Sequence, residues 1–315
     1  MNILHIYSSF ESSQGGPPVA IKYLAMSQVL SGHKVTILTY FKKKKLNIPG
    51  IKIVNIKYFL KKYSIPDIRS LKIIKLHIKK NDIVHLHGMW NGLISVSAFF
   101  AKKSKSLITP HGMGVRKNIY NKPIFKKIYH IIFDKFLFKN INGCHYLSLH
   151  EYKNTKWILG NKKYCIQHNL IDTQKIKNYI NKNRTKKIFD KNLINLVYLG
   201  RFNEIKNIEF QIDLVKKIIK KNKKILLHLI GPNNRYKDSL KKKIKKNNLE
   251  KYIKLKSPIF SEKKYLFLNQ ANFVLLTSKY ECNSILALET ISSGGLLVAN
   301  KNCNLDLYSK LQTCI

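Results

Sequence analysis

Two carboxylates eight residues apart carry the most chemical information in this sequence. Glu281 follows an apolar run at residues 271–277, which predicts a buried strand, and Glu289 lies two turns along a helix predicted at 284–294. Ligands of open α/β sheets bind beyond the carboxyl ends of the strands, where Glu281 is expected. Ionised carboxylates at this edge accept hydrogen bonds from the hydroxyl groups of a sugar or a ribose.

The start of the same predicted helix adds a site for an anion. The backbone N–H groups of Asn283, Ser284, Ile285 and Leu286 lie there, and free N–H groups at a helix amino terminus bind phosphate. Carboxylates that accept hydrogen bonds from hydroxyl groups, placed beside a phosphate site, indicate a ligand that carries both hydroxyl and phosphate groups. The alternative is a solvated loop glutamate and a glutamate on a helix face, with no ligand.

A second group of charged residues follows another predicted strand, at residues 193–200. Arg201 and Lys206 share the loop that leads from this strand into a helix. A guanidinium fork and a lysine point charge in one loop suit a diphosphate. Only five of the 59 basic residues are arginine, so arginine at position 201 is unusual for this chain. The competing interpretation is two solvated cations in a very basic chain.

The elements that must position these residues alternate along the sequence. A strand at 2–9, a glycine turn at 14–18, a helix at 19–30 and a strand at 34–40 form a βαβ unit. Further short apolar runs occur at 51–56, 82–87, 106–109 and 144–149, and helical stretches alternate with them. The first half therefore predicts a parallel sheet covered by helices.

The second half of the sequence repeats the alternation. Strands are predicted at 193–200, 225–231, 252–256, 271–277 and 296–300, and helices at 207–220, 236–246, 262–269 and 284–294. The residues before this half are polar, rich in lysine and asparagine and weakly periodic, which suits a linker. We predict an α/β fold with two Rossmann-like domains, at 1–175 and 193–315, joined by a linker at 176–192 and facing a central cleft.

Composition limits the classes of partner. The net charge of +43 on 315 residues would attract nucleic acid, anionic lipid or polyanionic substrates. Lysine is spread through most segments, and asparagine and isoleucine are also abundant, which is the bias of an AT-rich genome. We therefore take mutational bias as the first explanation of the high net charge and association with an anionic membrane surface as the second. We expect no nucleic-acid partner. A dinucleotide oxidoreductase is disfavoured because no G-x-G-x-x-G motif follows the first predicted strand of either half, at 2–9 or at 193–200.

Location follows from what the sequence lacks. No run of 18 or more uncharged apolar residues occurs, and residues 1–7 read as a strand without a basic lead, so we expect neither a membrane span nor a signal peptide. The five cysteines show no paired spacing typical of zinc or of a disulfide framework. A cytoplasmic protein, peripheral on the inner face of the membrane, is the expectation.

The motifs together resemble the nucleotide-sugar glycosyltransferases of the GT-B fold, specifically the retaining family 4 with its capsular and exopolysaccharide members. The resemblance covers nearly the whole chain, and it rests on the order in which the motifs occur along the sequence. They are Gly15-Gly16, the segment Gly32–Thr36, Asp82–Trp90, Thr109–Met113, Asn169–Asp172, the pair Arg201 and Lys206, Ile230-Gly231-Pro232 and the two-carboxylate segment.

The resemblance implies roles for individual residues. Arg201 and Lys206 would bind the donor diphosphate and stabilise the departing nucleotide without a metal or any other cofactor. Glu289 would hold the ribose, and Glu281 would contact hydroxyls of the donor sugar. His111 would sit near the reacting carbon, where the alternative is a structural histidine before a glycine, and Gly16 would let the backbone approach the phosphates.

Two departures from the family pattern affect these expectations. Cys282-Asn283-Ser284 follows Glu281 where the family has Gly-Phe-Gly, so side chains occupy backbone positions that glycine keeps open in the family. The family also continues for several elements beyond the position of Ile315, so the second domain is expected to be incomplete.

Two functions follow. The first is a retaining transferase that moves a sugar from a nucleoside-diphosphate sugar to a polysaccharide or lipid-linked saccharide. The alternative is an inactive, truncated relative that binds nucleotide sugar or anionic membrane without turnover.

Overall fold

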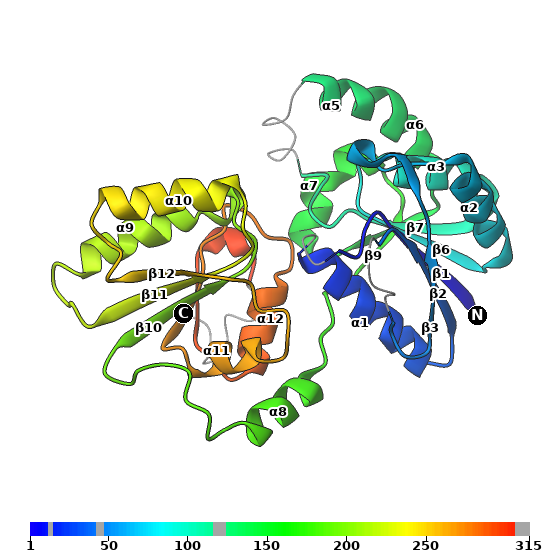
Figure 1. The fold of residues 1–315 in the computed structure, drawn as a ribbon. Helices are drawn as coiled ribbons and strands as arrows, with labels where there is room; N and C mark the ends of the chain where they lie inside the picture. The colour runs from blue at the N-terminus through cyan, green and yellow to red at the C-terminus, as the bar shows by residue number, and fades with distance from the viewer. Residues whose placement is uncertain (12–14, 42–46, 116–123, 306–315) are drawn as a thin grey trace. The chain divides into compact units, whose positions relative to one another are not determined.

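The computed structural model describes residues 1–11, 15–41, 47–115 and 124–305. The chain separates into two compact units, Met1–Leu170 and Ile171–Ile315 (Figure 1). Gln14 in the predicted glycine turn and residues 306–315 of the predicted second domain lie outside the described residues.

The first unit contains a seven-stranded sheet with the order β3-β2-β1-β6-β7-β8-β9, in which all neighbours are parallel. The strands are β1 (Asn2–Tyr7), β2 (Lys34–Thr39), β3 (Ile51–Asn55), β6 (Ile83–His87), β7 (Lys105–Thr109), β8 (Gly143–Tyr146) and β9 (Lys163–Ile166). A small antiparallel pair, β4 (Tyr58–Leu60) and β5 (Ile65–Pro66), lies between β3 and the next helix in sequence.

Helices connect the parallel strands of the first unit. They are α1 (Gly16–Leu30), α2 (Ile68–Lys80), α3 (Gly92–Phe100), α5 (Ile124–Tyr129), the π-helix η4 (His130–Asp134), α6 (Lys135–Phe138) and α7 (Leu149–Leu159). Polar side chains begin several of them: Asp67, Asn91 and Ser148 each accept a hydrogen bond from a backbone N–H in the first turn.

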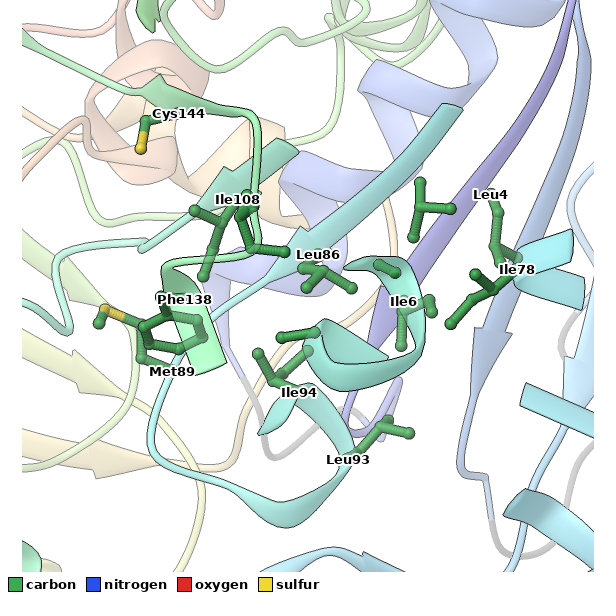
Figure 2. Packing of buried hydrophobic residues seen from close by; sticks show 14 of the residues in the cluster. Leu4, Ile6, Ile78, Leu86, Met89, Leu93, Ile94, Ile108, Phe138 and Cys144 are labelled. Carbon is green, nitrogen blue, oxygen red and sulfur yellow. The ribbon is translucent and has the colours of Figure 1, made fainter. Parts of the chain in front are cut away.

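The two faces of this sheet bury different sets of side chains. Successive side chains of a strand point to opposite faces, and Leu4 and Ile6 of β1 join an apolar cluster with Leu86 of β6 and Ile94 of α3 (Figure 2). His5, between the two β1 residues of that cluster, is buried on the opposite face. One face therefore carries this larger apolar cluster, and the other combines buried histidine with a smaller apolar cluster that includes Tyr7 of β1, Ile37 of β2 and Ile21 of α1.

The second unit is a smaller sheet of the same kind. Its strands have the order β12-β11-β10-β13-β14, all parallel. They are β10 (Ile194–Leu199), β11 (Ile225–Ile230), β12 (Ile253–Lys256), β13 (Phe273–Leu276) and β14 (Leu297–Ala299), with helices α8 (Thr173–Lys182), α9 (Ile208–Ile218), α10 (Arg235–Lys246), α11 (Lys264–Gln270) and α12 (Ile285–Ser292).

Helices cover both faces of this second sheet. Leu196 and Tyr198 of β10 pack in one cluster with residues of α9 and α10, and Val197, between them, packs in another with residues of α11 and α12. Figure 1 shows α9 and α10 lying along one side of the strands. The α/β class predicted from the sequence is confirmed.

The segment predicted as a linker contains a helix. Helix α8 starts after Asp172, whose side chain accepts a hydrogen bond from Lys175 N, and it buries Ile176. Tyr179, one turn further on, meets the ring of Tyr265 edge-on. These apolar residues lie among so many lysines and asparagines that the sequence reads as featureless, although one face of the helix packs on α11 and α12.

Candidate functional site

The predicted charged residues of the second unit gather at one edge of its sheet. Strands β10 and β13 are parallel neighbours, so the loops after their carboxyl ends are adjacent. The first loop holds Arg201 and Lys206, and the second holds Glu281. Lys279 N donates to Ile205 O at 2.7 Å, which ties the two loops together.

Lys206 and Glu281 form an ion pair between these loops. Ser278 Oγ also donates to Glu281 Oε1, at 2.7 Å, and Asn203 begins the short helical turn at 204–206 by accepting from Lys206 N at 3.1 Å. Both side chains of the pair are partly buried. The Glu281 carboxylate therefore holds the Lys206 ammonium at the edge of the sheet. The sequence predicted that each residue follows a strand, but it did not predict the ion pair between them.

Arg201 is exposed, beside a close approach of two strand ends. Its carbonyl oxygen accepts from Tyr198 Oη at 2.8 Å, and Gly200 N donates to Ile230 O at 3.0 Å. A side chain at Gly231 would put its Cβ 2.3 Å from Gly200 O. The glycine is needed because the backbones after β10 and β11 touch here.

Helix α12 begins at the same edge. Ser284 accepts from Ala287 N at 3.3 Å, and the N–H groups of Ile285 and Leu286 in the first turn have no partner within the helix. Asn283 and Ser284 are buried, and Ile285 and Leu286 are partly exposed. The predicted anion-binding segment is thus a helix amino terminus, as its sequence indicates.

Glu289 lies on the buried side of α12 with a partner that sequence reasoning missed. Lys264 Nζ of α11 donates to Glu289 Oε1 at 2.5 Å. Burial raises the pKa of the Glu289 carboxyl, and the neighbouring Lys264 ammonium opposes this effect. The ion pair engages one carboxylate oxygen and leaves the other available for a second hydrogen-bond donor.

His111 belongs to the first unit, in the loop after β7. Its φ of 51° is in the left-handed region, and Gly112 follows with φ 74°. The fully buried carboxylate of Glu151 accepts from Gly112 N at 2.6 Å and from Leu147 N at 2.7 Å, and so clamps this loop to the end of β8. Sequence reasoning missed Glu151, because an acidic residue in a polar helix carries no local signal of burial.

Gly16 is the first residue of α1. Gly15 before it has φ 73° and ψ −133°, a conformation that glycine adopts readily. Pro17 and Pro18 have no backbone N–H, so the first turn of α1 offers Gly16 N but loses two donors. Gly16 can therefore present only a narrow anion site.

A row of imidazoles leads inward from His111 beneath α1. His87 Nδ1 lies 3.1 Å from His111 Nε2, His5 Nδ1 lies 2.8 Å from His87 Nε2, and Gln28 Oε1 of α1 lies 2.7 Å from His5 Nε2. We call these four residues the histidine row. The register pairs β1 with β6, and the alternation of each strand puts His5 and His87 on the same face of the sheet.

Burial controls the charge of the histidine row. It lowers the pKa of His5 to about 4 and that of His111 to about 3, and it lowers the pKa of His87 well below its usual value. Nearby imidazoles, among them His85 and His145, add to the effect. The rings are therefore neutral at pH 7.

Two histidines of the row, together with His85, form the one group within the described ranges that could hold a metal ion by the proximity of its ligand atoms. His5, His85 and His87 each bring a ring nitrogen within 4.8 Å of the others. The sequence predicted no metal site.

Comparison with known sequences defines the family. Residues 14–175 match the family profile described as "Glycosyltransferase Family 4", and residues 179–308 match the profile described as "Glycosyl transferases group 1". The chain belongs to glycosyltransferase family 4. It is also 24% identical over 326 aligned residues to an uncharacterised 41.2 kDa protein in the cps region of Klebsiella pneumoniae, covering 97% of this chain and 82% of that protein.

Solved structures show the same fold. Sucrose-phosphate synthase from Thermosynechococcus elongatus aligns over 98% of this chain and 83% of its own, with a TM-score of 0.73 and 14% identity. HepE from Anabaena in complex with UDP aligns over 96% of this chain and 81% of its own, with a TM-score of 0.67 and 12% identity. The chain is a glycosyltransferase of the GT-B fold. Among the described residues, no helix is both long and apolar enough to span a bilayer.

Proposed function

We propose that this chain transfers a sugar, with retention of anomeric configuration, from a nucleoside-diphosphate sugar to a polysaccharide or a lipid-linked saccharide. The observation that carries this proposal is the pair of tied loops after β10 and β13, where Glu281 holds Lys206 in the loop that also carries Arg201. Two cations next to a helix amino terminus suit a diphosphate, and carboxylates suit hydroxyls. The relative in a capsule region and the neighbour that binds UDP support this substrate class.

In this proposal the cations perform the main electrostatic task. Arg201 and Lys206 neutralise the charge that develops on the departing diphosphate, which is the role a metal ion has in other transferases. The N–H groups at the start of α12 and that of Gly16 face phosphate oxygens, and Glu289 holds the ribose. Glu281 and His111 contact hydroxyls of the sugar, and His111 lies near the reacting carbon.

A direct test begins with a thermal stabilisation screen of nucleotide sugars on the full chain, since a ligand that binds the native state raises its stability. Transfer to saccharide acceptors would follow, with the product anomer read by NMR. The proposal requires stabilisation by a nucleotide sugar and a product of retained configuration. An inverted product would contradict retention, and binding without transfer would favour the inactive relative.

The two carboxylates are expected to fail differently when neutralised. Glu289→Gln should weaken UDP binding roughly tenfold through the lost ribose contact. Glu281→Gln should leave UDP affinity unchanged or higher, because it removes a negative charge beside Lys206, and it should weaken the extra affinity that the sugar adds. Calorimetric titration with UDP and UDP-glucose measures both effects, with the exposed Glu250→Gln as control. Equal losses of UDP affinity in both variants would contradict this division.

The location that accompanies this function is the cytoplasmic face of an anionic membrane. The run of α5, η4 and α6 leaves large apolar side chains exposed: Ile124, Ile128, Ile132, Phe133 and Phe136. Ile132 and Phe133 are adjacent, and the other spacings are three or four residues, which puts most of these side chains on related faces of one helical run. An exposed apolar surface on a chain with net charge +43 suits the interface of an anionic bilayer.

Vesicle sedimentation tests this surface. The chain should bind vesicles that contain phosphatidylglycerol, with salt reversal, and bind neutral vesicles weakly. Replacing Phe133 and Phe136 together with serine should weaken binding at least roughly tenfold, since burying each ring contributes about 1.5–3 kcal/mol. The matched control is Phe260→Ser, an exposed phenylalanine of the second unit. Equal binding by the double variant and the control would exclude this surface.

A further inference from the structure

The histidine row has a direction that its ends determine. A carboxamide oxygen only accepts hydrogen bonds, so Gln28 Oε1 requires a proton on His5 Nε2. A neutral imidazole carries one N–H, which leaves His5 Nδ1 as an acceptor for a proton on His87 Nε2. The same step repeated requires a proton on His111 Nε2. His111 Nδ1 is then left with a lone pair.

A second row on the same face of the sheet also carries Nε2–H tautomers, but it donates its hydrogen bonds in the opposite direction, from β6 toward β9. His145 Nε2 lies 2.9 Å from the carbonyl oxygen of Gln167, which can only accept, so His145 Nδ1 must accept from Thr109 Oγ1 at 2.9 Å. The threonine hydroxyl has a single proton, and it therefore accepts from His85 Nε2 at 2.7 Å. The backbone carbonyl of Gln167 can only accept, so it fixes the tautomers of His145 and His85. These two residues therefore serve as a reference for the tautomers of the first row.

The distances favour shared protons over a shared metal ion. Two nitrogens bound to one tetrahedral zinc at about 2.0–2.1 Å lie roughly 3.3 Å apart. The nitrogens of His5 and His87 are 2.8 Å apart, a hydrogen-bond distance, and both ring nitrogens of each residue already have partners in the row. A metal ion would have to break these bonds.

We propose that Gln28, His5 and His87 are positioning residues that hold His111 as its Nε2–H tautomer, so that His111 offers a hydrogen-bond acceptor to a hydroxyl group of the saccharide substrates. This inference rests on the proposed function for the identity of the ligand. An Nδ1 lone pair accepts from a hydroxyl and repels an anionic phosphate oxygen, which has no proton to give. The row thereby assigns His111 to the sugar and excludes it from the diphosphate.

The tautomers can be measured without any activity. Two-bond nitrogen–proton correlation spectra of the full chain with labelled histidine separate the two neutral tautomers, the imidazolium and a metal-bound ring. Loss of signals in single variants assigns them among the eleven histidines. At pH 7 we expect Nε2–H for His5, His87 and His111, as for His85 and His145. An Nδ1–H tautomer in the row, an imidazolium, or a stoichiometric metal by elemental analysis would overturn the proposal.

Three changes at Gln28 test its control of the row. Gln28→Glu keeps an acceptor and should retain the Nε2–H tautomers. Gln28→Lys replaces the acceptor with a donor and should reverse all three rings to Nδ1–H. Gln28→Leu removes the partner and should yield a mixture of tautomers. Spectra of His145, in the other row, should stay unchanged in every variant and thus report that the fold is intact. An unchanged His111 tautomer in both Gln28→Lys and Gln28→Leu would refute the positioning role.

Transfer kinetics separate this inference from the function on which it rests. The kcat should fall at least roughly tenfold in Gln28→Lys, stay within about twofold in Gln28→Glu, and change more than the KM for the donor. Equal kcat values in the two variants, with reversed tautomers confirmed, would show that the sugar does not use the His111 lone pair. If no nucleotide sugar is transferred by the native chain, the proposed function fails while the tautomer spectra still decide the positioning role.

Discussion

Lys206→Ala is expected to weaken the binding of UDP and GDP by roughly 10- to 100-fold, because a charge-assisted contact contributes about 1.5–3 kcal/mol. Arg201→Ala should weaken it too, by a smaller factor. The difference arises because Lys206 is also the partner of Glu281. Its removal leaves a partly buried carboxylate without a counterion, and this carboxylate repels the diphosphate. Calorimetric titration of the full chain with both nucleotides measures each effect.

A double variant isolates the contribution of that repulsion. Lys206→Ala combined with Glu281→Gln should bind UDP more tightly than Lys206→Ala alone, since the uncompensated charge is gone. Lys242→Ala, on the exposed side of α10, is the matched control for the loss of one positive charge. If Arg201→Ala and Lys206→Ala bind both nucleotides as tightly as this control, the diphosphate site is not at this sheet edge.

The fold could be predicted because its signals are local. The apolar runs at 2–9 and 193–200 contain β1 and β10, and the alternation of strands and helices leaves a parallel sheet as the simple solution. Helix α8 was missed because Ile176 and Tyr179 are scattered among polar residues. Strand β9 was missed for the related reason that all its residues are exposed, so it has no buried face to mark it.

The site could be predicted in position but not in contacts. The sequence placed Lys206 and Glu281 each after the carboxyl end of a strand, and the pairing of β10 with β13 in the folded sheet is what brings the two residues together. The partner of Glu289 could not be found this way, because Lys264 comes from another helix and is one lysine among many. The same holds for Glu151, because the backbone N–H groups of Gly112 and Leu147 that donate to it are brought to it only by the folded structure.

The histidines illustrate how strand periodicity could have revealed more. His85 and His87 alternate with Val84 and Leu86, a pattern of two faces that predicts histidines on one side of β6. His5 and His145 alternate with apolar residues in the same way. The periodicity indicates a shared face, but the register between strands, which sets the distances, is a property of the folded sheet.

Acid is expected to destabilise the first unit because its buried histidines are neutral. The native pKa of His5 is lowered to about 4, whereas the unfolded chain binds a proton near 6.5. Stability from this residue is therefore fully present above pH 6.5 and is lost as the pH falls toward 4, amounting to about 3 kcal/mol. His111, His87 and His85 act in the same direction. Glu289, in the second unit, acts oppositely because its pKa is raised.

Tryptophan fluorescence can follow the first unit selectively, because Trp90 and Trp157 are the two tryptophans of the chain. Urea unfolding at pH 7, 6 and 5 should show a free energy of unfolding that falls at each step, with a slope near 1.4 kcal/mol per pH unit for each proton taken up by the unfolded chain. His5→Gln should reduce that slope, and His150→Gln, on the surface of α7, should not. A free energy of unfolding that stays constant from pH 7 to 5 would show that the buried imidazoles carry charge in the native state, contrary to the hydrogen-bond direction inferred for the row.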